Sequence, residues 1–137
     1  MLTKQRLRGF GMNVDEICFL YDQGKDEIVH LFFMCPYSQR CVDVVQNWLG
    51  FQVCADWSSI HRDRSLTMFC RQIRFAVICA LIYHIWRGRN LARLSGYVPH
   101  PKSVVQSIMW EMRSRIRKQG RNLSLCNLEW IKSKCLW

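Results

Sequence analysis

The segment that most constrains the fold is an apolar stretch in the middle of the chain, residues 65–90. Its apolar side chains recur three or four residues apart, at Leu66, Phe69, Ile73, Ala76, Val77, Ala80 and Leu81. This spacing is that of one face of an α-helix, and a helix that is apolar nearly all round must be buried. We therefore expect a central helix at 65–90, with the remaining segments packed around it.

This central segment is not expected to cross a membrane. Its longest apolar run, FAVICALIY at residues 75–83, is about half of the roughly 20 residues that span a bilayer. Arg74, His84 and Arg87 flank the run closely. The sequence therefore predicts a core helix and no membrane partner.

Two further helices are marked by proline at the start and glycine at the end. Pro36 begins an amphipathic segment at 36–49, and Gly50 follows its last apolar residue. Pro101 begins another, with an apolar row at every fourth residue, and Gly120 is expected to end it. Proline is tolerated at the first helical position and glycine adopts the left-handed conformation after the last.

Shorter elements are expected near both ends of the chain. Thr3 can cap a helix at 4–8, and residues 124–135 form a short amphipathic segment. Residues 12–29 are predicted as loop and turn, and no segment gives a firm strand pattern. The fold class is therefore mainly α.

The positive charge is concentrated in the second half of the chain. Residues 1–60 hold five Lys/Arg against seven Asp/Glu, whereas residues 61–137 hold fifteen against three. Clustered cations favour a polyanionic partner, although an arginine-rich helix face kept soluble by its charge explains the pattern equally well. The candidate nucleic-acid contacts are Arg87, Arg89 and Arg93 on the central helix, and Arg113, Arg115, Arg117, Lys118 and Arg121 on the next helix and its exit.

Three residues near the N-terminus have the types and spacing of metal ligands. Cys18, His30 and Cys35 offer two thiols and an imidazole just before a predicted helix. Zinc takes four such donors in a tetrahedron, two on a tight turn and two at a helix entrance. The partner of Cys18 in a C-x2-C knuckle would be at position 21, which is Tyr21. A buried cysteine pair beside a hydrogen-bonded histidine remains the alternative interpretation.

The fourth position of such a zinc site is open. A neutral phenol with a pKa of about 10 is a poor zinc ligand beside a thiolate. The neighbouring Asp22 can supply an oxygen, water can close the site, or the site has decayed. Cys41 is six residues of helix away from Cys35, about 9 Å along the axis, and is therefore disfavoured.

Four stretches of the chain resemble the zinc-binding region that follows the reverse transcriptase in plant LINE-type (non-LTR) retrotransposons. They are LTKQRLRGFGM, the cysteine at position 18, VHLFFMCPYSQ and a downstream WLG, and the later YHIWRGRN is similar to another block of that region. The resemblance covers residues 2 to about 90. It implies that Cys18, His30 and Cys35 are three of four zinc ligands and that Tyr21 replaces the fourth.

The resemblance also implies the organisation and partners of the chain. Residues 1–90 would form the reverse transcriptase zinc-binding-like domain, with a knuckle at 18–35 and helices at about 36–49 and 65–90, and residues 91–137 a basic helical tail. An upstream reverse transcriptase is an implied partner, and a nuclear location is implied by the family alone. The eight cysteines and the lack of a signal-peptide pattern favour reduced thiols inside a cell.

The expected function is non-catalytic. The sequence has no Y-x-D-D polymerase motif, and the HRD at 61–63 has no glycine-rich phosphate loop beside it. A zinc module that binds RNA or single-stranded DNA is the first hypothesis, and a structural or protein-interaction fragment is the alternative. Trp86 and Trp110 have rings that stack on bases, but their helical spacing is more typical of core residues. The oligomeric state is left open.

Overall fold

The computed structural model describes residues 2–50, 66–119, 123–134 and 136 of the 137-residue chain. The mainly α fold is confirmed: the described elements are helices, joined by loops and one isolated β-bridge. The segment at 51–65, which contains the HRD of residues 61–63, and the expected helix end at Gly120 lie outside the described residues.

The first two α-helices begin where the sequence predicts. Helix α1 spans Lys4–Gly9, and the side chain of Thr3 accepts a hydrogen bond from the backbone N–H of Arg6 at its start. Helix α2 spans Pro36–Leu49 and ends at Gly50, whose φ of 69° is the left-handed conformation that glycine adopts at low cost. The capping residues therefore determine where α1 begins and where α2 ends.

The central helix is longer than predicted. Helix α4 spans Met68–Ser95, with the Thr67 side chain accepting from the backbone N–H of Cys70. Its C-terminal end is set by Gly96 in the left-handed conformation. The helix expected at 65–90 therefore ends five residues later, because Leu94 and Ser95 belong to the last helical turn.

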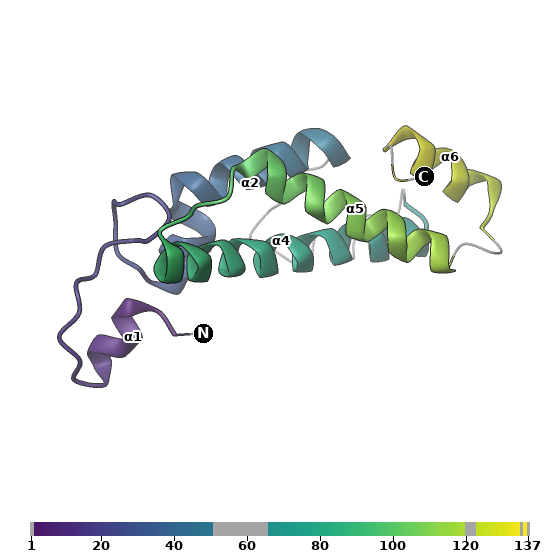
Figure 1. Cartoon of the computed structure of the whole chain (residues 1–137). Helices are drawn as coiled ribbons and strands as arrows, with labels where there is room; N and C mark the ends of the chain where they lie inside the picture. Colours follow the sequence, from purple (N-terminus) through teal and green to yellow (C-terminus); the bar gives the residue numbers. More distant parts are fainter. Residues whose placement is uncertain (1, 51–65, 120–122, 135, 137) are drawn as a thin grey trace.

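Two helices follow α4 and pack back onto it (Figure 1). Helix α5, Pro101–Gln119, packs on α2 and α4, and helix α6, Leu125–Ser133, contacts α4. The predicted apolar row of α5 is buried, at Val104, Val105, Ile108, Met112 and Ile116. These residues share one core cluster with the buried residues of α2 and α4.

The C-terminal segments are tied to the rest of the chain by hydrogen bonds as well. The indole N–H of Trp48 donates to the carbonyl of Lys134 at 2.7 Å, and the Thr67 hydroxyl donates to Asn127 at 2.7 Å. The division proposed at residue 90 falls inside α4. Residues 101–119 thus belong to the same packed core as the first half.

Helix α4 is the one described helix that is long and apolar enough to cross a bilayer by length and composition. Core helices of soluble proteins meet the same test, and α4 buries Ile73, Val77, Leu81 and Ile85 in the cluster shared with α2 and α5. The expectation of no membrane span stays a prediction.

Candidate metal centre

The first candidate ligand lies on a tight turn between α1 and α2. An isolated antiparallel bridge pairs Ile17 with Lys25, and the backbone N–H of Cys18 donates to the carbonyl of Gly24 at 3.0 Å. Inside the turn, the N–H of Asp22 donates back to the carbonyl of Cys18 at 3.0 Å, with Asp22 at a φ of 52°. Residues 18–24 therefore form a closed loop with the Cys18 side chain buried at its base.

The other two candidate ligands are brought together by a wide helical turn. Residues His30–Met34 form a π-helical turn, η1, and the N–H of Cys35 donates to the carbonyl of His30 at 2.7 Å. In an α-helix, residues five apart point about 140° away from each other. The wider i→i+5 turn instead stacks position 35 below position 30. This turn is what brings His30 and Cys35 to the same side.

The first turn of α2 holds the π-turn in place. The buried Ser38 hydroxyl donates to the carbonyl of Leu31, and the Gln39 amide donates to the carbonyl of Phe33 at 3.2 Å. Carbonyls in a π-turn lose their usual i+4 partners, so these side chains replace the missing hydrogen bonds. Helix α2 thus has the candidate ligand Cys35 at its N-terminal cap and supports the π-turn through its first turn.

The three side chains converge within the size of a zinc site. Their donor atoms all lie within 4.8 Å of one another, and the two sulfurs are 3.9 Å apart. Two thiolates that bind zinc at about 2.3 Å with a tetrahedral angle between them lie about 3.8 Å apart. A disulfide needs about 2.05 Å, and the described cysteines are free thiols.

The imidazole of His30 provides the second test of fit. Its Nε2 is buried and has no hydrogen-bond partner among the described residues. Buried polar atoms are nearly always paired, because an unpaired one costs about 1–3 kcal/mol. A bound cation on Nε2 removes that cost. The chemistry and spacing of the donor set therefore fit a zinc ion.

The electrostatics of the two thiols differ. The pKa of Cys35 is lowered, first because the Cys18 thiol donates to it, and further by the backbone N–H groups of Ser38 and Tyr37. The pKa of Cys18 is raised, because its proton is held by Cys35 and because it is buried. Since the thiolate is the form that binds metal, Cys35 is the thiol that more readily supplies one.

A glycine that the sequence reasoning did not assign to the site shapes it. Gly24 has a φ of 74°, and a Cβ at this position would lie 2.4 Å from Cε1 and 2.7 Å from Nδ1 of His30. The imidazole of His30 therefore lies directly against the backbone of Gly24. The sequence predicts loop and turn at residues 12–29, but only the structure shows that the ring of His30 packs against Gly24.

The candidates for a fourth protein ligand lie outside the cluster. Asp22 is exposed and is not part of the group of donor atoms, and Tyr21 is also exposed. Cys41 is buried in α2 and is not part of the group of converging donor atoms either. Within the described residues, the cluster therefore consists of three protein donors.

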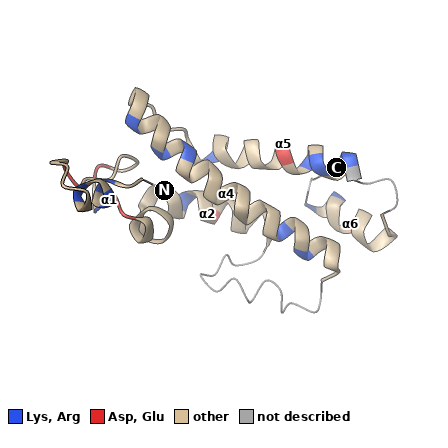
Figure 2. Cartoon of the chain, turned by 90° about the horizontal axis from the view of Figure 1, so that it is seen from below, with Lys and Arg blue, Asp and Glu red and all other residues tan. Residues whose placement is uncertain are grey.

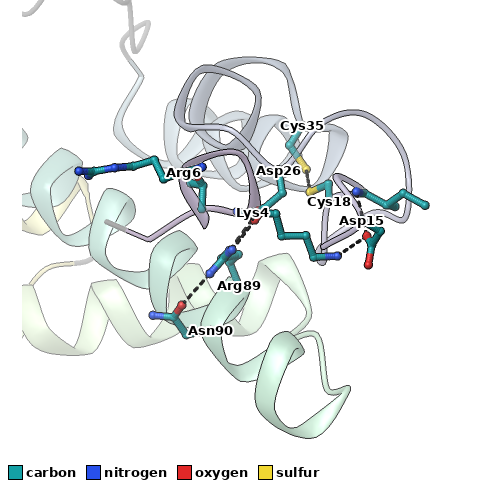
Figure 3. Close-up of polar contacts among 10 residues, drawn as sticks. Lys4, Arg6, Asp15, Cys18, Asp26, Cys35, Arg89 and Asn90 are labelled. Atoms are coloured by element: carbon teal, nitrogen blue, oxygen red, sulfur yellow. Dashed lines mark hydrogen bonds and ion pairs between the residues drawn. The ribbon is translucent and has the colours of Figure 1, made fainter. Parts of the chain in front are cut away.

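Figure 3 shows the buried ion pair of Asp26 with Arg89 in the same view as the sulfurs of Cys18 and Cys35. The carboxylate of Asp26 accepts from Nε of Arg89 at 3.1 Å and from Nη2 of the same side chain, and it also accepts from the backbone N–H of Lys4 at 2.7 Å. Both ionic side chains are almost fully buried. The interpretation of Arg89 as a phosphate contact is therefore wrong: through Asp26, this side chain joins α4 to α1.

The other predicted nucleic-acid contacts separate into two groups (Figure 2). Arg87 and Arg93 are exposed near the end of α4, whereas Arg115, Arg117 and Lys118 are exposed near the end of α5. Because α5 folds back along α4, these two ends lie far apart (Figure 1). Arg113 is half-buried and has an interaction within the protein, and Arg121 lies outside the described residues.

The two tryptophans also differ in environment. Trp86 is half-buried and packs against the core cluster. Trp110 is 70% exposed, so its interpretation as a core residue is wrong. At 100° per residue, Trp110 points away from the buried Ile108 and Met112 and toward the side of Arg117.

The comparisons with known proteins locate a family resemblance in the N-terminal part. Residues 1–41 match the family described as zinc-binding in reverse transcriptase. No curated protein and no solved structure matches the chain. The matched stretch holds all three clustered donors. This match supports a reverse transcriptase zinc-binding domain in residues 1–41, as the sequence resemblance indicated.

Proposed function

We propose that the chain is a non-catalytic zinc-binding module, derived from a retrotransposon polyprotein, that binds RNA or single-stranded DNA through its basic half. The observation that carries the proposal is the convergence of Cys18, His30 and Cys35 inside the matched family region. Because the described residues offer three protein ligands, water would complete the tetrahedron. In the parent polyprotein, an upstream reverse transcriptase is the natural partner, and the nucleus the natural location.

Zinc in this module acts on the fold rather than on a substrate. Cys18 lies on the 18–24 loop and Cys35 at the start of α2, so one ion fastens the loop to the helix. The free energy of metal binding is then added to the stability of the folded chain. With one protein ligand fewer than a Cys3His site, the affinity for zinc is correspondingly lower.

The nucleic-acid surface in this proposal is the outer face of α5. The exposed Trp110 ring and the exposed cations Arg117 and Lys118 share a helix whose opposite face is buried. Bases of any sequence stack on an exposed indole, and cations bind the phosphates, with the release of condensed counterions. Such a surface favours single strands, because paired bases do not expose their faces.

The test is the binding of oligouridine between about 50 and 200 mM salt. We expect the affinity to fall as salt rises, and the Arg117→Gln/Lys118→Gln double variant to reduce the log–log slope by about 1.4, at about 0.7 per phosphate on a single strand. Trp110→Ala should weaken binding about tenfold, since a stacked base is worth about 1–3 kcal/mol.

A charge-matched control separates this surface from net charge. Arg8→Gln/Lys25→Gln also removes two exposed cations, but from the acidic half of the chain. It should leave the slope nearly unchanged. Equal slopes for both double variants, or binding that does not respond to salt, would remove the nucleic-acid part of the proposal.

The protein-interaction alternative has one observation in its favour. Ile28, Val29, Phe33 and Met34 are exposed apolar side chains around the π-turn. Contiguous exposed apolar side chains often mark interaction sites. If this alternative is correct, oligouridine does not bind, and light scattering shows a mass that rises with protein concentration.

A further inference from the structure

An open pocket lies between the start of the chain and the last turns of α4. Its volume is about 440 Å³, and Leu2, Trp86, Asn90, Arg93 and Leu94 line it. This volume is within the range of about 300–1,000 Å³ typical of small-ligand sites. The pocket is at the opposite end of the helical layer from Arg117 and Lys118, so it is separate from the α5 surface (Figure 1).

Three side chains of one helix give the pocket three different chemical groups. Trp86, Asn90 and Arg93 are four and seven residues apart, which puts them on one face of α4. They supply an aromatic ring, an amide and an exposed guanidinium. A ring, an amide and a cation side by side match the parts of a nucleotide, which are a flat base, its polar edge and a phosphate.

The amide of Asn90 is held in one orientation (Figure 3). Nη1 of Arg89 donates to Oδ1 of Asn90 at 3.2 Å, and Arg89 is itself fixed by the buried Asp26 carboxylate. The oxygen of Asn90 is therefore engaged on the protein side. The Nδ2 group of Asn90 carries two N–H donors, and Asn90 lines the pocket, so this side chain can offer a donor to a ligand.

We infer that this pocket takes one unpaired nucleobase that presents a carbonyl acceptor, with Trp86 against the ring, Asn90 donating to the carbonyl and Arg93 on the adjacent phosphate. The inference rests on the proposed function and adds a second, base-reading site to it. Leu2 and Leu94 form an apolar rim that suits the face of a base better than a sugar or a free phosphate. Uracil is the simplest base with such carbonyl groups.

The test compares oligouridine with an abasic oligonucleotide of the same length, in the Trp110→Ala background that removes stacking on α5. The two probes share the phosphate backbone, so the ratio of their affinities reports base recognition alone. Asn90→Asp is the informative variant. It keeps an oxygen acceptor for Arg89 and replaces the N–H donors with an acceptor.

We expect the affinity of the Trp110→Ala protein for oligouridine to be at least about tenfold higher than its affinity for the abasic probe. Asn90→Asp and Trp86→Leu should each reduce this ratio several-fold, whereas Arg93→Gln should weaken both probes alike. Because Trp86 also packs on the core, the ratio for Asn90→Asp decides. A ratio near one in the Trp110→Ala protein, or an unchanged ratio in Asn90→Asp, overturns the inference of a base-binding pocket. Salt-dependent binding of oligouridine by the wild-type protein would still support the proposed function. Loss of binding to both probes by wild-type protein overturns the proposed function as well.

Discussion

Asp26→Asn is expected to lower the free energy of unfolding by about 3–5 kcal/mol, the cost of leaving one partner of a buried ion pair alone. The substitution keeps the shape of the side chain and one acceptor for the backbone N–H of Lys4. It leaves the guanidinium of Arg89, which is fully buried, without a counter-charge. Domains are stable by about 5–15 kcal/mol, so a urea midpoint should fall steeply with an unchanged m-value.

Two further variants show whether the loss comes from the unpaired charge. Asp43→Asn makes the same chemical change at an exposed position of α2, where an effect within about 0.5 kcal/mol is expected. The double variant Asp26→Leu/Arg89→Met removes both charges and should recover much of the stability. An effect of Asp26→Asn no larger than that of Asp43→Asn would contradict the structural role of the pair.

Gly24→Ala is expected to weaken zinc binding by more than about 100-fold, the upper end of the loss for an outer-shell partner. The new methyl group would lie 2.4 Å from Cε1 of His30, so the imidazole must leave its position. Competition with a chromophoric zinc chelator measures the change. The same variant tests whether His30 is a ligand, because the two thiols are not displaced by this methyl group.

Gly11→Ala is the matched control. Gly11 has a φ of 82°, so alanine there meets a similar backbone strain of about 1–2 kcal/mol, but a Cβ would have no heavy atom within 4 Å. We expect Gly11→Ala to lower stability and to leave zinc affinity unchanged. Equal zinc affinity in both variants would show that His30 does not bind the ion.

Most of the helical framework could be predicted from the sequence because its signals are local. Thr3 caps α1, Pro36 begins α2, and Gly50 ends it, each through its own backbone or side-chain chemistry. The sequence pattern predicts the end of this helix at residue 90, five residues before its end in the structure. The helix instead continues to Gly96, where a residue with positive φ ends it.

The sequence predicts which residues form the candidate metal cluster, but not how the backbone brings them together. Residue types and spacing selected Cys18, His30 and Cys35, which the structure brings together. The π-turn that aligns two of them has no residue pattern of its own, because it depends on Ser38 and Gln39 bonding to its carbonyls. The role of Gly24 depends on its contact with the imidazole of His30 six residues further along the chain, which the residue types alone do not show.

The errors among the cations and aromatic residues have one physical origin. Spacing in the sequence shows which residues share one face of a helix, but it does not show which face the rest of the protein covers. Arg89 was assigned to the surface, but its partner Asp26 is 63 residues away in the chain. Trp110 was assigned to the core, but it faces away from the buried row of α5. Only the tertiary arrangement decides such cases.

The central claim is that two thiolates and one imidazole bind the zinc ion. Because position 21 is a tyrosine, the fourth coordination position is left to an oxygen or nitrogen donor. X-ray absorption of the zinc-loaded protein counts these ligands directly. For wild-type protein we expect two sulfurs at about 2.3 Å, one imidazole and one further oxygen or nitrogen, and for Tyr21→Cys three sulfurs and tighter binding. Wild-type protein that binds no zinc, or a sulfur count that Tyr21→Cys does not raise, would contradict the account.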